Sequence, residues 1–309
     1  MKVLISLLLF LCLPLQAEPT PLRVGSTLWS GYEPLYLAQH NGYYNDDVRI
    51  INYPSTSEVI RAFRNQALEV AALTLDEIVL LEEQDIPVTI FLICDISDGA
   101  DAILARPPIA NMQQLKGQKV AVESTAVGAY VLTRSLELNQ LKVADIQPIN
   151  RENNEQLESY MDNEVNAVVT YEPVRTQLLN AGAKEIFTSR EIPGEVVDVL
   201  AVHNEYLQSR NGDLDKLVGG WFKALQYMKE QPQRSYEFIA SRQKIPTYQV
   251  EMSFEGLELP AKEKMRQLMS GQPSTLEQTI QRLAKTMKNN GLLASHIKTS
   301  GLISNQFIR

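Results

Sequence analysis

Short apolar runs alternate with amphipathic segments through the first hundred residues of the chain. Runs typical of buried strands occupy residues 22–28, 48–54, 69–74, 87–94 and 98–107. Helical patterns lie between the first four of them, at residues 31–44, 55–68 and 75–84, and Ser55 and Glu58 have the spacing of a capping box. This alternation with short connections predicts an α/β fold with a mostly parallel sheet.

The pattern changes around the tandem prolines Pro107 and Pro108, where we place a crossing into a second unit. Strand-like runs then recur at residues 118–123, 146–150, 165–171 and 184–189, separated by helical patterns at 124–139, 154–163 and 172–182. A strand from residue 196 crosses back, and amphipathic helices follow it to the end of the chain. We therefore predict that residues 107–204 are inserted into a first unit made of residues 18–106 and 205–309.

Residues 1–17 have the pattern of a secretory signal peptide. Lys2 precedes an apolar stretch that is too short for a stable membrane span, and the small residue Ala17 follows it. We expect cleavage after Ala17 and export to the periplasm, with an N-terminal anchor helix as the alternative. No later apolar run approaches the roughly 20 residues of a transmembrane helix, so no stable membrane insertion is expected.

Composition narrows the classes of function. The formal net charge is −8 and no basic cluster occurs, which disfavours binding to nucleic acid. Cys94 is the only cysteine beyond the expected signal peptide, and His40, His203 and His296 are too far apart in sequence to form a metal-ligand motif. No nucleophile elbow, phosphate loop or zinc-protease motif is present. We predict no catalytic residue, metal or cofactor, and we expect a monomer.

Polar and aromatic residues follow the ends of the predicted strands. In an α/β sheet these ends meet at one edge, where ligands bind. Hydroxyls at helix starts suit polar or anionic groups, aromatic faces suit flat or cationic ligands, and carboxylates suit amines. The residues at these ends are Trp29, Ser30, Gly31, Tyr32, Glu33, Ser55, Thr56, Ser57, Thr74, Asp76, Ser97, Asp98, Asp101, Ser124, Thr125, Val127, Tyr171, Glu172, Pro173 and Asp198.

Four segments together resemble a known family. They are residues 30–44, 55–74, 96–137 and 168–174, with the sequences "SGYEPLYLAQHNGYY", "STSEVIRAFRNQALEVAALT", "ISDGADAILARPPIANMQQLKGQKVAVESTAVGAYVLTRSLE" and "VVTYEPV". They are similar to the periplasmic substrate-binding proteins of the nitrate, sulfonate, taurine and thiamine-precursor type, the NMT1/THI5-like family. The segment around "LKGQKVAV" and its Ser/Thr-rich continuation is the most specific, and "YEP" at 171–173 matches an aromatic-Glu-Pro motif of the family.

The resemblance implies a two-lobed type II periplasmic binding fold, with mixed, mostly parallel sheets flanked by helices and a ligand cleft between the lobes. It implies a small-molecule ligand and an ABC importer permease in the inner membrane as partners. The ligand-contacting positions carried over are Trp29, Gly31, Tyr32, Ser55, Thr56, Ser57, Thr74, Asp98, Ser124, Thr125, Val127, Tyr171 and Glu172, to which the return strand adds Asp198.

The charge at these positions indicates the class of ligand. Acids predominate and no Arg or Lys is evident, since Arg61 and Arg106 fall on a helix surface and at a strand end. We therefore favour a ligand with an amine or an aminopyrimidine-like ring, with a sulfonate held by backbone N–H groups as the alternative. Two other functions stay open: a binding protein for a membrane sensor, and an enzyme related to pyrimidine synthases, although such enzymes carry a Cys-rich motif that is absent here.

Overall fold

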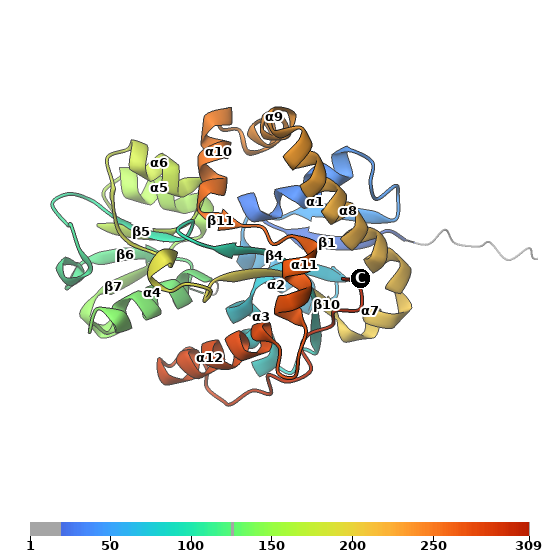
Figure 1. Cartoon of the computed structure of the whole chain (residues 1–309). Helices are drawn as coiled ribbons and strands as arrows, with labels where there is room; N and C mark the ends of the chain where they lie inside the picture. Colours follow the sequence, from blue (N-terminus) through green and yellow to red (C-terminus); the bar gives the residue numbers. More distant parts are fainter. Residues whose placement is uncertain (1–19, 125–126, 309) are drawn as a thin grey trace, which may run out of the picture.

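The computed structural model describes residues 20–124 and 127–308, which form two β-sheets, each flanked by helices (Figure 1). The first sheet has the strand order β11-β4-β10-β3-β1-β2 and the second has the order β7-β6-β8-β5-β9. The strands of the first sheet are β1 (Leu22–Ser26), β2 (Val48–Asn52), β3 (Val70–Thr74), β4 (Val88–Ser97), β10 (Val197–His203) and β11 (Leu257–Glu258). Those of the second are β5 (Ala102–Ala105), β6 (Lys119–Val122), β7 (Gln147–Asn150), β8 (Ala167–Thr170) and β9 (Lys184–Thr188).

The first sheet is mixed because the return strand enters its middle. Strand β1 pairs in parallel with β2 and β3, whereas β10 is antiparallel to both β3 and β4. Every residue of β3 and β10 is buried, as expected for strands that carry continuous apolar runs and are covered on both faces. The predicted α/β class and the two-lobed fold are thereby confirmed, and β10 supplies the antiparallel element that local sequence pattern did not specify.

Helices cover both sheets, and the C-terminal ones return to the first. Strands β1, β2 and β3 of the first sheet are each followed along the chain by a helix: α1 (Glu33–His40), α2 (Thr56–Arg64) and α3 (Leu75–Glu83). Strands β6, β7 and β8 of the second sheet are likewise followed by α4 (Val127–Leu138), α5 (Asn153–Met161) and α6 (Val174–Asn180). The C-terminal helices are α7 (Asn204–Ser209), α8 (Asn211–Glu230), α9 (Pro232–Gln243), α10 (Thr247–Glu255), α11 (Lys262–Met269) and α12 (Thr275–Asn289). Helix α8 packs on α1, and α12 packs on α3 and extends toward the second lobe (Figure 1).

The start of α2 illustrates how local sequence sets these elements. The Ser55 hydroxyl accepts a hydrogen bond from the Glu58 backbone N–H at 3.4 Å, as the capping-box spacing indicates. One face of the helix then buries Val59 and Phe63 completely. Helix α2 therefore begins immediately after the loop that follows β2, which places Thr56 and Ser57 at the edge of the cleft.

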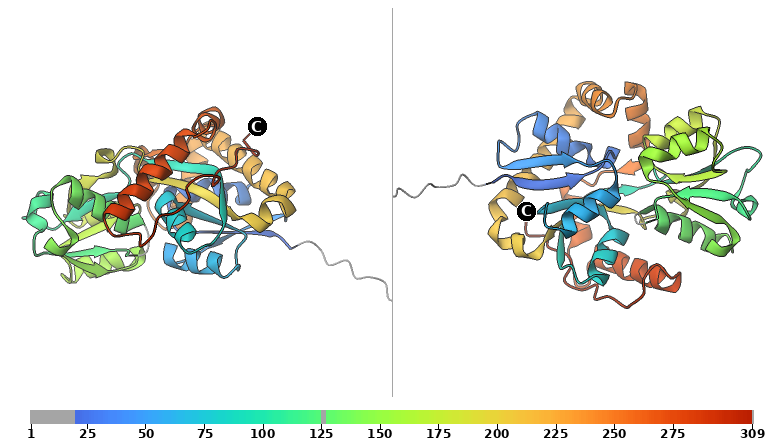
Figure 2. Two further views of the ribbon diagram at one scale, coloured as in Figure 1. Left: turned by 90° about the horizontal axis from the view of Figure 1, so that it is seen from below. Right: turned by 180° about the vertical axis from the view of Figure 1, so that it is seen from behind.

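The chain crosses between the sheets twice, at residues 98–101 and 189–196 (Figure 2). The Ser189 hydroxyl joins the two crossings, because it lies 2.8 Å from the Ser97 hydroxyl and accepts a bond from the Gly99 N–H at 2.6 Å. Strand β5 belongs to the second sheet and β10 to the first. We therefore propose lobe boundaries within these two crossings, which end six residues before position 107 and eight residues before position 204, the boundaries expected from sequence.

The sequence predicts a signal peptide and no further membrane-spanning segment. The expected signal peptide, residues 1–17, lies outside the described residues. Within residues 20–124 and 127–308, no helix combines the length and apolar character needed to cross a bilayer.

Cys94 is completely buried in β4, and burial raises the pKa of its thiol well above the usual value. A thiol in that environment is a core side chain rather than a nucleophile.

Candidate functional site

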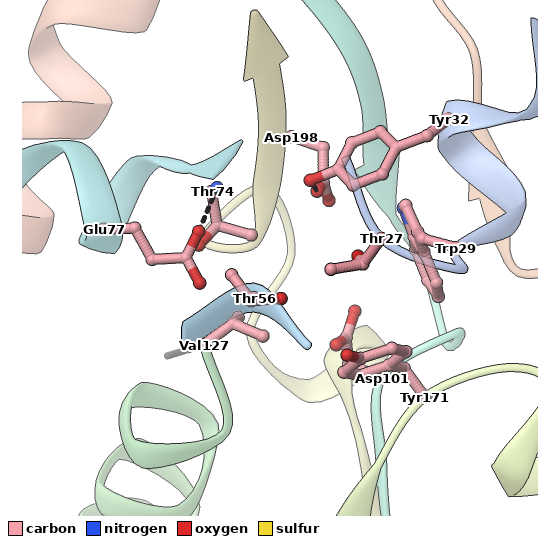
Figure 3. Close-up of a pocket in the computed structure, with 10 residues that line it drawn as sticks. All are labelled: Thr27, Trp29, Tyr32, Thr56, Thr74, Glu77, Asp101, Val127, Tyr171 and Asp198. Atoms are coloured by element: carbon pink, nitrogen blue, oxygen red, sulfur yellow. Dashed lines mark hydrogen bonds between the residues drawn. The ribbon is translucent and has the colours of Figure 1, made fainter. Parts of the chain in front are cut away.

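A narrow pocket lies between the two lobes at the ends of several strands (Figure 3). We call it the inner pocket. Most of its lining comes from the first lobe, Asp101 comes from the crossing after β4, and Val127 and Tyr171 come from the second lobe. The lining residues are Thr27, Trp29, Tyr32, Thr56, Thr74, Glu77, Asp101, Val127, Tyr171 and Asp198.

Three aromatic side chains form part of its wall. The rings of Trp29 and Tyr171 meet edge to face across the cleft, with centroids 5.4 Å apart and planes at 86°. This geometry is a favourable arrangement for two rings, and it joins the lobes because the two residues belong to different ones. Tyr32 donates its hydroxyl to the Asp198 carboxylate, so that both side chains face the same space (Figure 3).

Three carboxyl groups face the inner pocket without a basic residue among its lining. Glu77, Asp101 and Asp198 are 1%, 4% and 4% exposed. Within the described part of the chain, Glu77 Oε1 and Asp101 Oδ2 are buried atoms with no hydrogen-bond partner. Buried carboxyl oxygens normally have partners, so these two atoms are free to bind a donor from a ligand.

Burial raises the pKa of each of these acids. The pKa of Glu77 is about 8 because of desolvation and, secondarily, the charge of Asp76, and that of Asp101 is about 6, mainly from desolvation. Desolvation and the neighbouring Asp95 raise the pKa of Asp198 well above its usual value. Part of this cluster is therefore protonated at neutral pH, and a cation entering the pocket would favour its ionised form.

The backbone at Gly31, beneath the pocket, leaves no room for a side chain. A Cβ at this position would lie 1.8 Å from Asp95 Oδ2 and 2.5 Å from Trp29 Nε1. The Trp29 indole N–H donates to that same Asp95 oxygen at 3.1 Å. Gly31 thus lets the turn pass directly over a buried carboxyl group, and this contact fixes the Trp29 ring in the pocket wall.

The predicted site residues divide into two groups. Trp29, Tyr32, Thr56, Thr74, Val127, Tyr171 and Asp198 line the inner pocket. Gly31, Ser55, Ser57, Asp98, Ser124 and Glu172 do not line it, and Thr125 lies outside the described residues. A role in ligand binding stays a prediction for all of them.

The second group has other contacts. Ser55 caps α2, and the Ser57 hydroxyl donates to Glu152 of the second lobe at 3.0 Å. Asp98 and Ser124 are exposed. Glu172 is buried, but its carboxylate forms an ion pair with Arg175 at 3.0 Å and accepts a bond from the Thr176 hydroxyl at 2.9 Å.

Thr27 and Glu77 line the pocket but were not among the predicted residues, and Asp101 was noted only as a strand-end acid. Glu77 occupies the third position of α3, where its carboxylate accepts the Thr74 N–H at 2.9 Å. That capping-box spacing was the available signal for Glu77. Glu33, in contrast, is completely buried in an ion pair with Arg242 and points to helix α9 rather than to the ligand space.

The acids of the pocket are not arranged as a metal site. Among residues 20–124 and 127–308, no group of three or more His, Cys, Asp or Glu side chains is placed to hold a metal ion. Arg61 is mostly exposed beside Glu58, and Arg106 stacks on the Tyr160 ring at 4.0 Å, so neither supplies positive charge to the pocket. The arrangement suits an organic group that donates hydrogen bonds.

Several solved structures that are similar to this chain are described as binding proteins, two of them as periplasmic. The alkanesulfonate-binding protein SsuA from Xanthomonas axonopodis pv. citri, bound to MOPS, has a TM-score of 0.79 at 14% identity, covering 93% of this chain and 99% of its own. The aliphatic sulphonate binding protein SsuA from Escherichia coli has a TM-score of 0.74 at 16% identity, with coverage of 94% and 99%. The nitrate-binding protein NrtA from Synechocystis PCC 6803 has a TM-score of 0.77 at 12% identity, with coverage of 94% and 87%.

The sequence itself identifies the family. Residues 29–235 match the family described as NMT1/THI5 like, and the chain belongs to that family. The resemblance inferred from its motifs is confirmed. No curated protein sequence matches the chain. At identities of 9% to 16%, the similar structures establish the fold and leave the ligand to be argued from the pocket.

Proposed function

We propose that this protein is a periplasmic solute-binding protein that captures a small amine-bearing solute by closure of its lobes and delivers it to an ABC importer. Membership of the NMT1/THI5-like family and the two-lobed fold support the binding role. The proteins SsuA and NrtA, named for binding sulfonates and nitrate, share that fold. The proposal involves no chemical conversion of the ligand.

The observation that carries the choice of ligand is the pair of unpartnered carboxyl oxygens, Glu77 Oε1 and Asp101 Oδ2, in a pocket lined by no basic side chain. An ammonium group or a protonated aminopyrimidine supplies the donors that these atoms lack. The faces of Trp29 and Tyr171 add a favourable environment for a cation or a flat ring. A sulfonate or nitrate would meet acids here instead of the cationic donors that suit an oxyanion.

Closure is supported by contacts that join the lobes around the pocket. Trp29 packs against Tyr171, and the Ser57 hydroxyl donates to Glu152 at 3.0 Å. A ligand that bridges Asp101 and Glu77 on one side and Tyr171 on the other would add to these contacts. Binding would therefore shift the protein toward the closed arrangement, because the bound solute interacts with both lobes only in that state.

Thermal and calorimetric titrations of residues 18–309 test the proposal. Primary amines, polyamines, aminopyrimidines, taurine, alkanesulfonates and nitrate form the panel. A ligand present at 100 times its dissociation constant should stabilise the folded state by about 2.7 kcal/mol. Asp101→Asn keeps the shape but removes a charge, and should weaken binding of the preferred amine by about ten- to a hundred-fold.

Asp215→Asn is the matched control, because Asp215 is an exposed residue of α8 that does not line the inner pocket and is not among the predicted site residues. It should leave amine binding unchanged. Binding of sulfonates or nitrate without any amine would overturn the choice of ligand. Absence of binding to every compound of the panel would count against the proposed function as a whole.

A further inference from the structure

A single turn between β1 and α1 carries Thr27, Trp29 and Tyr32 into the inner pocket (Figure 3). We call residues 27–32 the aromatic turn. Residues Ser30–Tyr32 form one turn of 3-10 helix within it. Helical segments this short are stabilised mainly by tertiary contacts. The orientation of the aromatic turn therefore depends on the elements that hold it.

The base of the aromatic turn is closed by Tyr36 of α1. The Tyr36 hydroxyl lies 2.8 Å from the Ser26 hydroxyl at the end of β1 and donates to the Asn52 side-chain oxygen at 3.2 Å. Within the turn, the buried Ser30 hydroxyl donates to the buried Ser253 hydroxyl of α10 at 2.9 Å. The turn is thus tied both to its own strand and to the C-terminal helices.

The most extensive of these connections is the ion pair between Glu33 and Arg242. Glu33 directly follows the aromatic turn, and its side chain is completely buried. Arg242, near the end of α9, donates to the Glu33 carboxylate through Nε at 2.8 Å and through a second nitrogen, and Gln243 Nε2 donates to it at 2.7 Å. A bidentate guanidinium–carboxylate pair fixes orientation as well as distance. This contact therefore fixes the start of α1 and, with it, the end of the aromatic turn.

Arg242 is itself held from a second direction. Its guanidinium lies over the Tyr36 ring, 3.6 Å from the centroid. One cation thus contacts the residue that follows the aromatic turn and the residue that closes its base. Arg242 is not part of the lining of the inner pocket, but it borders an adjoining cavity that shares Thr27 and Tyr171 with that pocket. In the unliganded protein its effect on the pocket therefore passes through Glu33.

The two rings of the aromatic turn are held at their polar ends by the first sheet. Trp29 donates its indole N–H to Asp95 of β4 at 3.1 Å, and Tyr32 donates its hydroxyl to Asp198 of β10. The backbone that carries the rings is held from the other side by α9 and α10. Side chains fixed in this way before binding lose little freedom when a ligand arrives, which favours affinity.

We propose that Arg242 is a positioning residue of the binding site, which holds Glu33 and thereby keeps the aromatic turn in the conformation that presents Trp29 and Tyr32 to the solute. This inference rests on the proposed function, because it takes the inner pocket as the binding site. In this role Arg242 acts on the solute only through Glu33. Helix α9 thus takes part in the site, although the lining of the inner pocket comes from other elements.

The fluorescence of Trp29 in the unliganded protein tests the inference. The chain has two tryptophans, and Trp221→Phe leaves Trp29 as the only one. Within the described part of the chain, Trp221 Nε1 is buried without a hydrogen-bond partner, so this substitution breaks no hydrogen bond. In that background, Arg242→Met removes the guanidinium and keeps an unbranched side chain. Trp29, which is 4% exposed in the native protein, should become more accessible to quenching by acrylamide, with its emission shifted to longer wavelength.

Calorimetry measures the consequence for binding. The probes are n-butylamine and 4-aminopyrimidine. Arg242→Met should weaken the affinity for whichever probe binds the native protein by about five- to a hundred-fold, because two aromatic side chains would have to be immobilised on binding. Arg242→Lys keeps the charge but loses the planar fork, so it should give intermediate values of both quenching and affinity. If Arg242→Met does not fold, Arg242→Lys decides the question.

Arg23→Met is the matched control. Arg23 donates through Nε at 3.0 Å and through a second nitrogen to Glu69, which is 5% exposed and contacts β1 away from the aromatic turn. Its loss should lower stability and leave the quenching of Trp29 unchanged.

Three results would contradict the proposals, and they are distinguishable. Unchanged Trp29 quenching in both Arg242 variants, with stability alone reduced, would show a purely structural ion pair and overturn the inference. Weaker binding with unchanged quenching would indicate direct contact between Arg242 and the probe, and would overturn it as well. Failure of the whole panel to bind the native protein would count against the proposed function, whereas the quenching of Trp29 would still decide whether Arg242 fixes the turn.

Discussion

Replacing Gly31 by alanine adds one methyl group to the most crowded turn of the candidate site. The backbone angle of Gly31 does not require glycine, since its φ is not positive, but the space does. The new Cβ would lie 1.8 Å from Asp95 Oδ2, whereas real Cβ contacts essentially never fall below 3.0 Å. Asp95 is completely buried, so its carboxyl group has no solvent into which it could turn.

The expected loss of stability in Gly31→Ala has two sources, overpacking and a broken hydrogen bond. Overpacking of a dense interior costs about 1–3 kcal/mol. Displacement of Asp95 or of the turn also breaks the 3.1 Å bond from the Trp29 indole N–H, and a buried donor without a partner costs about 1–3 kcal/mol more. We expect Gly31→Ala to lower the free energy of unfolding by about 2–6 kcal/mol. Ligand affinity should fall as well, because the Trp29 ring loses its fixed position.

Urea denaturation measures the free energy of unfolding, and a shift of the midpoint at constant slope shows that stability itself has changed. Gly219→Ala is the control: a Cβ there meets nothing within 4 Å, and alanine favours the interior of α8 by up to about 1 kcal/mol. In an Asp95→Ala background, Gly31→Ala should cost far less, because the two effects share one contact. A Gly31→Ala protein with unchanged stability and unchanged ligand affinity would refute this reasoning.

Three further predictions address pH, lobe closure and packing. Burial raises the pKa of Glu77 from 4.5 to about 8 and that of Asp101 from 3.8 to about 6, so these groups stabilise the unliganded protein below pH 4 and lose that contribution as pH rises through 6 and 8. Amine affinity should rise over the same pH range, because binding of the cation releases protons from these acids. Calorimetry in buffers of different ionisation enthalpy detects that proton release, and pH-independent binding would contradict the prediction. Ser57→Ala removes the hydroxyl that donates to Glu152 across the lobes at 3.0 Å. Ligand affinity should therefore fall about two- to ten-fold, while the free energy of unfolding changes by less than about 1 kcal/mol. An unaltered affinity would argue against a role of this hydrogen bond in lobe closure. Gly220→Ala places a Cβ 2.2 Å from the Tyr44 ring and should lower the free energy of unfolding by about 1–3 kcal/mol. In the same denaturation assay, this change should be opposite in sign to that of Gly219→Ala. Equal effects of the two substitutions would show that helix propensity outweighs packing.

Much of the fold follows from local sequence. The apolar runs at 70–73 and 199–202 became strands buried on both faces, and the Ser55–Glu58 spacing became a capped helix start, because side-chain periodicity and capping are local properties. The four segments that resemble the family, among them the motifs around 115–122 and 171–173, led to the family that the match over residues 29–235 confirms. Seven of the predicted strand-end residues meet in the inner pocket because the ends of the strands converge at the cleft.

The composition of the site was decided by tertiary structure. Sequence alone does not distinguish Asp98, which is exposed, from Asp101, which is buried with an unpartnered oxygen three residues later. Nor does it show that Glu33 and Glu172 are neutralised by Arg242 and Arg175, since the first of these pairs spans more than two hundred residues.

Local pattern determined which residues form strands, helices and caps, because those depend on neighbours within a few positions. Tertiary structure decided which acids keep their charge available for a ligand, because burial and pairing depend on chain segments that meet only when the lobes assemble. The inner pocket belongs to this second category. It exists only where residues from β3, β10 and helices α2, α3 and α4 are brought together by the fold.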